Sequence, residues 1–501
     1  MPHMQIPTLL VDMMKRSVED DCACPDHAFL FAAEPLPHTL ENDCACPDTA
    51  YRAQPNLPTA PLYTPTADTH HQPLPANFHL LHSPFAPAGP AVLNHAGWQE
   101  WQTFQDGRPL DPTNPLHQQL LEQTLLQPLG GRYTPTSTQG ETLTAWLHIT
   151  NACNLDCPYC YVRKSSARMS EATGLKAIRQ IFYTAQQQGF KQVKLKYAGG
   201  EATLHFRLVK KLHEEAQMLA QQTGIGLREV VLSNGYHIRP ADAEWLKEAG
   251  VKLMVSLDGV GELHDQQRPL KNGGSTFDQI QHTVDEVLLP LGLTPDITIT
   301  LTRLNAHGAA EAVRWCLERS LPISLNFYRP NLQSASRVEL ELEEQAIMAG
   351  MTAAYAAFEE QMPTRPFLNG LLDRVQAEAH THTCGVQHSY LVITHTGQLS
   401  QCQMHLGQPV QPHLEGNLIP LVAAGTIQNI SVDQKEGCRQ CEFRYRCSGG
   451  CPLETYRATG RWDINSPHCR IYKTLWPQAL RLEGLRLLKA HGIQFNGNAY
   501  N

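Results

Sequence analysis

The sequence predicts an α/β fold: a partial (β/α)6 TIM-like barrel with a winged-helix-like module before it and a cysteine-rich domain after it. Three observations support this prediction. Short apolar runs alternate with longer amphipathic runs from residue 143 to residue 330, which is typical of parallel strands joined by helices. A small group of strand and helix patterns precedes this region. Seven of the 15 cysteines lie between Cys384 and Cys469.

The composition excludes two classes of partner. The net charge of -8 provides no basic field for a phosphate backbone, so we expect no nucleic acid. No apolar run is long enough to cross a bilayer, and the start of the chain lacks the pattern of a secretory signal. We therefore expect a cytoplasmic protein with no membrane partner, in which clustered cysteines indicate metal or redox chemistry.

Residues 1–76 have the pattern of a flexible arm with an internal repeat. The unit Asp-Cys-Ala-Cys-Pro-Asp occurs at 21–26 and again at 43–48, and a linker-like stretch rich in Pro, Thr, His and Ala follows. The repeat thiols have three interpretations: solvated groups without a fixed role, four ligands of one metal, or a substrate-like segment presented to an active site of this same chain. The thiols are those of Cys22, Cys24, Cys44 and Cys46.

Residues 77–140 are expected to form a small winged-helix-like module. The pattern predicts strands at 78–81 and 90–94 and helices at 97–104 and 116–126. The module loosely resembles the peptide recognition element of enzymes that modify ribosomal peptides, which binds a leader peptide as an added strand. A simple cap on the following domain is an equally good interpretation.

Residues 141–332 carry the predicted partial barrel. Its helices have apolar residues at helical spacing, as in the segment 171–188. Six strand-helix units suit a partial barrel better than a complete one of eight. The expected strands are 143–150, 193–198, 229–232, 252–257, 296–301 and 323–328.

Three cysteines follow the first strand in a C-x3-C-x2-C spacing: Cys153, Cys157 and Cys160. Thiolate is the ligand that iron-sulfur clusters prefer, and three thiolates leave one iron of a four-iron cluster free. Such an open iron can bind a small molecule and pass it one electron. A zinc site or buried free thiols are the alternatives, although zinc sites usually close with a fourth Cys or His and none lies beside this loop.

Polar signatures also follow the next three strands. They are Gly199-Gly200-Glu201, then Ser233-Asn234-Gly235, then Ser256 with Asp258-Gly259. Each signature alone is typical of a turn. Their occurrence after successive strands indicates a shared site, because the C-terminal ends of barrel strands meet at one rim, where barrel enzymes hold their active sites.

With these motifs the chain resembles the radical SAM enzymes, a family named for S-adenosylmethionine (SAM). The resemblance covers the three-cysteine loop, with Tyr159 before its third cysteine, and the Gly-Gly-Glu motif, which Ala202 follows where the family usually has Pro. It implies that the catalytic cysteines of the loop hold a [4Fe-4S] cluster. The amino and carboxylate groups of SAM would chelate the open iron.

The resemblance also implies the contacts of SAM. Its amino group would lie at the Gly-Gly-Glu motif. Arg268 would lie near its carboxylate, which suits the paired hydrogen bonds of a guanidinium; a surface ion pair is the alternative. The expected cofactor-binding residues are Tyr159, Gly199, Gly200, Glu201, Ser233, Asn234, Ser256 and Arg268.

Residues 384–477 form the predicted cysteine-rich domain. Their pattern C-x12-G-x4-C, C-x2-C-x5-C-x3-C, C resembles the SPASM domain of peptide-modifying radical SAM enzymes at all seven cysteines. Seven thiolates are too many for one metal and nearly enough for two four-iron clusters. A zinc ribbon over residues 438–451 is the alternative.

The resemblance divides these cysteines between two auxiliary clusters, which makes three [4Fe-4S] clusters in the chain. One set is complete, and the other lacks a ligand that His380, His382 or an outside group would supply, unless its iron stays open for substrate. The complete set is Cys438, Cys441, Cys447 and Cys469, and the incomplete set is Cys384, Cys402 and Cys451.

The remaining segments have structural interpretations. Residues 333–383 are expected to be bridging helices, and residues 478–501 a closing helix and tail. Cys316, in a helical pattern, is interpreted as a small buried hydrophobe.

These features together predict an enzyme that modifies a ribosomal peptide or protein through a 5'-deoxyadenosyl radical. The expected product is an intrapeptide crosslink, either a thioether or a bond to carbon, and the expected partners are the peptide and an electron donor such as flavodoxin or ferredoxin. One alternative is a formylglycine-forming enzyme of the sulfatase-maturase type, which calls for a proton-accepting carboxylate. Another is an iron-sulfur electron carrier or redox sensor, which needs no SAM pocket.

Overall fold

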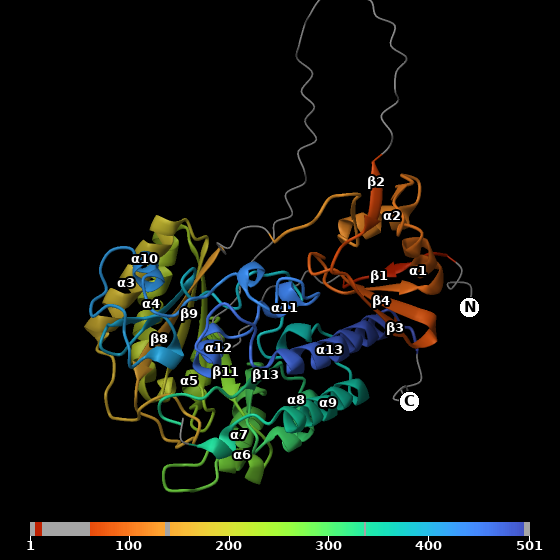
Figure 1. Cartoon of the computed structure of the whole chain (residues 1–501). Coiled ribbons are helices and arrows are strands. Elements are labelled where there is room, and N and C mark those ends of the chain that lie inside the picture. Colours follow the sequence, from red (N-terminus) through yellow and green to blue (C-terminus); the bar gives the residue numbers. More distant parts are fainter. Residues whose placement is uncertain (1–5, 13–60, 136–140, 335–336, 495–501) are drawn as a thin grey trace, which may run out of the picture.

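The computed structural model describes residues 6–12, 61–135, 141–334 and 337–494 (Figure 1). Its centre is an eight-stranded sheet in the order β13-β12-β11-β10-β9-β8-β14-β15. All neighbouring pairs from β13 to β8 are parallel, as predicted. These six strands are β8 (Thr142–Thr150), β9 (Gln192–Gly199), β10 (Gly226–Ser233), β11 (Lys252–Ser256), β12 (Asp296–Leu301) and β13 (Ile323–Phe327).

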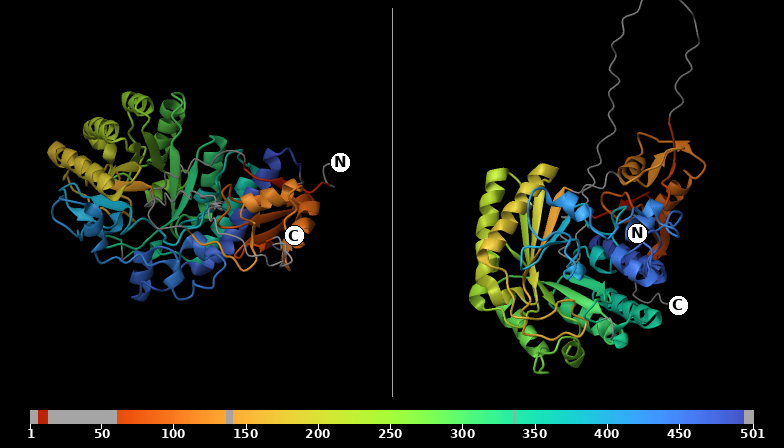
Figure 2. Two further views of the ribbon diagram at one scale, coloured as in Figure 1. Left: turned by 90° about the horizontal axis from the view of Figure 1, so that it is seen from above. Right: turned by 60° about the vertical axis from the view of Figure 1, so that its left-hand side comes forward.

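Helices cover the outer face of this sheet (Figure 2). The first begins at its N-cap Ser170, whose side chain accepts a hydrogen bond from the backbone of Thr173, and ends where Gly189 takes a left-handed conformation, with φ of 74°. Its apolar face, including Ile178 and Ile181, is buried in the main core. These helices are α3 (Glu171–Gln188), α4 (Phe206–Thr223), α5 (Pro240–Glu248), α6 (Glu262–Gln267), α7 (Phe277–His282) and α8 (Ala309–Glu318).

The cysteine-rich region adds two strands that the sequence did not predict. β14 (Tyr390–Ile393) pairs in parallel with β8, and β15 (Leu399–Ser400) pairs antiparallel with β14. The sheet therefore continues into the cysteine-rich region. Cys384 and Cys402, which flank this hairpin, lie in one hydrophobic cluster with Trp146 of β8.

The N-terminal module starts earlier than expected. Its main sheet has the order β1-β5-β4-β3, and a second sheet has the order β6-β2-β7. The expectation of a flexible arm up to residue 76 is therefore wrong for residues 9–10, 62–65 and 70–74; Pro73 is tolerated because β3 is an edge strand. The elements are β1 (Leu9–Leu10), β2 (Leu62–Pro65), β3 (His70–Leu74), β4 (Phe78–His82), β5 (Ala91–Asn94), β6 (Arg108–Pro109), β7 (Leu126–Pro128), α1 (His95–Gln102) and α2 (Pro115–Glu122).

A long C-terminal helix connects the module to the rest of the protein. α13 (Cys469–Ala490) packs against α9 (Glu344–Glu360) on one side and against β3 and β5 on the other (Figure 1). A Cβ atom added at Gly484 would lie 2.8 Å from Leu80, so glycine allows the module to approach closely. The helix starts at Cys469, well before the expected position 478. Shorter helices in this region are α10 (Leu418–Ala423), α11 (Arg444–Cys447) and α12 (Pro452–Thr459).

The module also contacts the cysteine-rich region through two arginines of α11. Arg444 pairs with Asp68, with Nη1 3.1 Å from Oδ1. Arg446 is fully buried and donates to the backbone oxygens of His82, at 2.8 Å, and Glu442, at 3.0 Å. None of the helices in the described residues is both long enough and apolar enough to cross a membrane.

Candidate active site

The three-cysteine loop is held in place at the end of β8. The backbone N–H of Asp156 donates to the carbonyl of Pro269 at 2.8 Å, and Leu155 forms an isolated bridge with Leu270. The N–H of Leu155 lies 3.4 Å from Sγ of Cys153, which is the geometry of a hydrogen bond to sulfur. The loop is therefore fixed to the segment that carries Arg268.

The two glycines of the Gly-Gly-Glu motif lie against this loop, with no room for a side chain at either position. A Cβ atom at Gly199 would lie 2.4 Å from the carbonyl oxygen of Thr150, and one at Gly200 would lie 2.3 Å from that of Ala152. The N–H of Gly200 donates to Thr150 at 2.6 Å, and that of Glu201 donates to Ala152 at 2.8 Å. Glycine is required because the two backbones touch.

The carboxylate of Glu201 joins the ends of β9 and β10. It is 2% exposed and accepts hydrogen bonds from the hydroxyl of Ser233 at 2.9 Å, from the N–H of Asn234 at 2.7 Å and from the N–H of Thr203 at 3.1 Å. Burial raises the pKa of this carboxyl group, and these donors oppose the shift. Glu201 thus organises the predicted SAM site, and its contact with the amino group stays a prediction.

Arg268 bonds to two side chains of the protein. Its Nη1 lies 3.1 Å from Oδ2 of Asp258, whose side chain is fully buried, and it also donates to the hydroxyl of Tyr159. The same hydroxyl donates to Asp258. The interpretation of Arg268 as part of a surface ion pair is wrong, since its side chain is only 11% exposed.

Every residue predicted to bind SAM or the first cluster lines one cavity of about 230 Å³. The cavity has walls from the barrel strands and from the cysteine-rich region. Residues that the sequence analysis missed also line it, because they carry no local motif. Tyr161 directly follows Cys160, and the others come from inside a strand or from segments distant in the sequence. They are Trp146, Tyr161, Arg329, Arg374, Gln403 and Met404.

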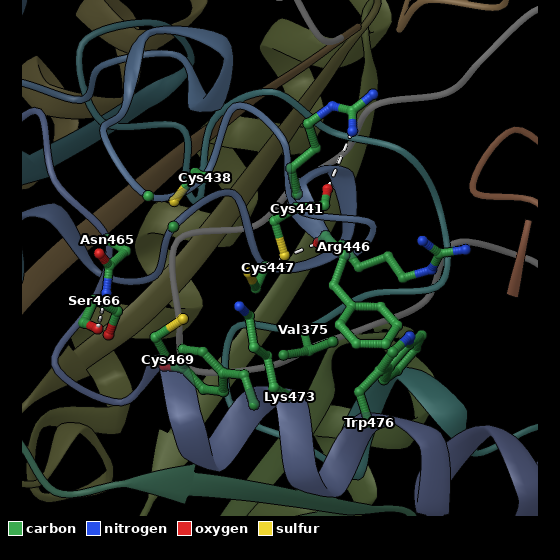
Figure 3. A pocket seen from close by; sticks show the side chains of 15 residues that line it. Val375, Cys438, Cys441, Arg446, Cys447, Asn465, Ser466, Cys469, Lys473 and Trp476 are labelled. Carbon is green, nitrogen blue, oxygen red and sulfur yellow. Dashed lines mark hydrogen bonds between the residues drawn. The ribbon is translucent and has the colours of Figure 1, made fainter. Parts of the chain in front are cut away.

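The predicted complete set of cysteines surrounds a second, smaller cavity. Figure 3 shows Cys438, Cys441, Cys447 and Cys469 around it, with Cys469 at the start of α13. Burial raises the pKa of Cys438 to about 11 and that of Cys447 to about 12. Within the part of the chain that the structure describes, no three His, Cys, Asp or Glu side chains stand close enough to enclose a single metal ion.

The incomplete set lies in a separate hydrophobic cluster, in which Cys384, Cys402 and Cys451 pack with Trp146. Asn429 Nδ2 lies 3.8 Å from Sγ of Cys384. His380 and His382 are engaged locally: Nδ1 of His380 contacts the carbonyl of Glu378 at 3.0 Å, and the ring of His382 lies against that of His388. A role of either histidine as the fourth ligand stays a prediction.

Lys435 is a charged residue that the sequence analysis did not single out. It is 1% exposed, and its ammonium group donates to the carbonyl of Ser448 at 2.7 Å. Burial lowers its pKa, while the thiols of both auxiliary sets oppose the shift. A cation therefore lies between the two sets, where it favours anionic ligands.

The model of the Radical SAM superfamily matches residues 147–291. The chain contains a radical SAM domain. A serine-type anaerobic sulfatase-maturating enzyme of Klebsiella pneumoniae is 25% identical over 70% of this chain and 91% of that enzyme. The sporulation killing factor maturation protein SkfB of Bacillus subtilis is 27% identical over 35% of this chain and 39% of that protein. The solved structure of anSMEcpe with bound AdoMet and Cp18Cys peptide has a TM-score of 0.57 and 18% identity, covering 69% of this chain and 98% of that one.

A radical SAM domain uses a [4Fe-4S] cluster and SAM, and the residues of this chain fit both. Three thiols and no fourth ligand come from the loop into the larger cavity. Burial raises the pKa of Cys157 to about 12, so the thiol needs a cationic partner such as iron to become a thiolate. The cavity beyond the thiols offers glycine backbone and hydroxyl and amide side chains, which suit a polar nucleoside.

Proposed function

We propose that this chain is a three-cluster radical SAM enzyme that crosslinks a peptide. The observation that supports this most is the larger cavity, because the three cysteines, the Gly-Gly-Glu motif and the ends of β10 and β11 all face it together. The two further cysteine sets would hold auxiliary clusters. The relative SkfB is a maturation protein by name, and the anSMEcpe structure contains a peptide, which agrees with a peptide substrate here.

When bound and reduced, the cofactors supply a 5'-deoxyadenosyl radical that takes a hydrogen atom from the substrate. Cys153, Cys157 and Cys160 would hold the cluster, with Gly199, Gly200 and Glu201 at the amino group of SAM. Ser233, Asn234 and Ser256 would lie at the ribose, and Tyr159 and Arg268 would close the carboxylate side. The walls from the cysteine-rich region would exclude water and oxygen and direct the peptide.

The auxiliary sites would receive the surplus electron of the crosslink. Cys384, Cys402 and Cys451 pack with Trp146, which also lines the larger cavity, so this set would lie next to the substrate. The set of Cys438, Cys441, Cys447 and Cys469 would pass the electron onward, and a flavodoxin or ferredoxin would reduce the first cluster.

Formylglycine formation is the second candidate, because the Klebsiella pneumoniae enzyme matches over 91% of its length. That chemistry needs a carboxylate base near the substrate. Among the described residues that line the cavity, Glu201 is the single acidic one, and its oxygens already accept four hydrogen bonds from protein N–H and O–H groups. This favours the crosslink.

The test is SAM cleavage by the anaerobically reconstituted chain with a strong reductant. We expect 5'-deoxyadenosine from the wild-type chain and none from Cys157→Ala. The control Cys316→Ala, in a helix of the hydrophobic core, should retain cleavage. Equal amounts of 5'-deoxyadenosine from wild type and Cys157→Ala would reject an enzymatic role. An electron-carrier function would then explain the clusters.

A further inference from the structure

The N-terminal segment of the chain occupies an edge of the module's main sheet. β1 pairs antiparallel with β5, with Leu9 opposite Leu93 and Leu10 opposite Val92. Leu9 is 9% exposed and belongs to the core of the module. Addition of a strand to a sheet edge is a mode by which proteins recognise peptides. Here the added peptide belongs to the chain itself.

Asn94 holds this strand from the side. Its Oδ1 accepts from the N–H of Thr8 at 3.0 Å, and its Nδ2 donates to the carbonyl of Ile6 at 2.7 Å. Its backbone N–H donates to the carbonyl of Thr8 at 3.2 Å. One buried side chain therefore fixes both the position and the direction of residues 6–8.

Asp12 fixes the other end of the segment. Its Oδ2 lies 2.6 Å from Nη2 of Arg486 on α13, and the two side chains are 5% and 3% exposed. The same nitrogen lies 2.8 Å from Oε1 of Glu483, which is fully buried. A buried charged group that loses its partner is strongly destabilising, so the chain leaves the module from a firmly held point.

The two Cys-Ala-Cys-Pro repeats come between this point and the next fixed one, Leu62 at the start of β2. Cys22 follows Asp12 by ten positions, a length of chain that spans at most about 33–36 Å. Attachment at both ends gives a segment a local concentration on the order of millimolar near the body of the protein. The repeats are thus attached on both sides to described parts of the same chain.

The charge of this segment is complementary to the larger cavity. Between Ser17 and Tyr51 the chain has eight acidic residues and no Lys or Arg. The described lining of the cavity contains Lys164, Arg268, Arg329 and Arg374 and the single acidic residue Glu201. Carboxylates outside this lining pair with three of the four cations: Asp156 with Lys164, Asp258 with Arg268 and Asp373 with Arg329. An adjoining cavity of about 340 Å³ exceeds the about 230 Å³ of the cavity lined by the predicted SAM contacts and shares Tyr161, Val162 and Met404 with it. Its described lining has Arg163 and no acidic residue. An acidic, extended peptide suits both.

We propose that this chain carries its own substrate: residues 6–12 dock on the module, and the Cys-Ala-Cys-Pro repeats enter the cationic cavity as the peptide to be crosslinked. The inference rests on the proposed function and names its substrate. The alternatives for the repeats, a fourth metal-binding group of cysteines or a segment without a fixed role, become outcomes of the test.

The chemistry balances with SAM as the oxidant. A repeat cysteine loses its S–H bond and a carbon of the same segment loses a C–H bond as one S–C bond forms. The hydrogen atom from carbon ends in 5'-deoxyadenosine, and the thiol proton goes to solvent. SAM becomes methionine and 5'-deoxyadenosine, and the electron that started its cleavage returns from the new bond to the auxiliary site.

The experiment uses the full chain, reconstituted anaerobically, with SAM and a strong reductant and no added peptide. We expect the intact mass to fall by two hydrogen atoms per crosslink and digestion to place the change in residues 17–51. A variant with all four repeat cysteines changed to Ala should show no mass change while it still forms 5'-deoxyadenosine. An unchanged mass in the wild type with continued SAM cleavage would overturn the inference and leave the proposed function intact.

Two further measurements test the attachment and the in-cis route. Leu9→Asp should slow the mass change about tenfold or more without changing SAM cleavage, because the segment loses its docking strand. Met218→Asp, on the exposed face of α4, is the matched control and should crosslink at the wild-type rate.

An isotope-labelled Cys157→Ala chain mixed with unlabelled wild type should stay unmodified; equal modification of both would show reaction between chains. A loss of iron in the four-cysteine variant would show a metal role instead, and also overturn the proposal.

Discussion

Arg268 and Asp258 form a buried ion pair, with Nη1 of the guanidinium 3.1 Å from Oδ2 of the carboxylate. Tyr159, from the three-cysteine loop, bonds to both through its hydroxyl. Oδ1 of Asp258 also accepts from the N–H of Thr300 at 2.7 Å, which fixes the carboxylate on β12. The pair therefore sets the position of the guanidinium beside the cluster loop.

Asp258→Asn should lower the free energy of unfolding by about 3–5 kcal/mol, because it leaves the buried guanidinium without its counter-charge. Chemical denaturation measures this. Asp285→Asn is the control: Asp285 pairs with Arg319 at 2.7 Å, but both side chains are partly exposed, so about 0–1 kcal/mol is expected. Equal losses in the two variants would mean that the buried pair has no special role.

Glu201→Gln should cost about 1–3 kcal/mol of stability, because an amide NH₂ would face the N–H of Asn234 or Thr203 and leave a buried donor unpaired. The variant should also bind SAM less well, since the ends of β9 and β10 lose their common acceptor. Calorimetry and thermal unfolding measure the two effects. Glu360→Gln, at an exposed ion pair with Arg314, should change neither. A Glu201→Gln variant of wild-type stability would contradict this description of the carboxylate.

Gly200→Ala should displace the three-cysteine loop, because the new Cβ would lie 2.3 Å from the carbonyl oxygen of Ala152. We expect a loss of about 1–3 kcal/mol, typical of overpacking, together with loss of about four irons per chain. Gly226→Ala, where the nearest atom is 3.5 Å away, should retain full iron content. Full iron in Gly200→Ala would show that the loop tolerates the shift.

His264 should make the protein less stable in acid. Burial lowers its pKa from 6.5 to about 4. Between these values the unfolded chain binds the proton and the folded protein does not, so the free energy of unfolding increases with pH across this range. The contribution, about 3 kcal/mol, is complete above pH 6.5 and is lost as the pH falls toward 4.

His264→Asn tests this pH dependence. Its Oδ1 could accept the hydrogen bond that Nδ1 of His264 receives from the N–H of Asp258 at 3.2 Å, and it does not titrate. Denaturation curves from pH 6.5 downward should be flatter for this variant than for wild type. The control His307→Asn, at an exposed position, should keep the wild-type slope. If the free energy of unfolding of His264→Asn depends on pH in the same way as that of wild type, His264 is not the source of the acid destabilisation.

Much of the barrel and its rim could be predicted because each feature has a local cause. The alternation of apolar and amphipathic runs predicted β8 to β13. The motifs from Cys153 to Ser256 lie together because parallel strands end at the same rim. Cys316 is buried in α8, as its helical pattern indicated.

The rest depends on contacts between distant residues. The pairing of β14 with β8 brings residues about 250 positions apart together, and a four-residue strand has no strong pattern of its own. β3 contains a proline and two histidines, and its edge position permits what its composition argued against. Arg329 and Arg374 reach the cavity from loops without a motif. The winged-helix-like character of the module and the roles of the cluster cysteines stay predictions.

The central claim is that the chain holds three clusters and that SAM binds the one on Cys153, Cys157 and Cys160. Iron analysis combined with electron paramagnetic resonance of the reduced protein tests it most directly. We expect about twelve irons per chain, and a spectrum in which SAM changes the signal of one cluster. The variant with all three of these cysteines changed to Ala should keep about eight irons and lose the response to SAM. About four irons in the wild type, or a SAM response that persists in the variant, would contradict the account.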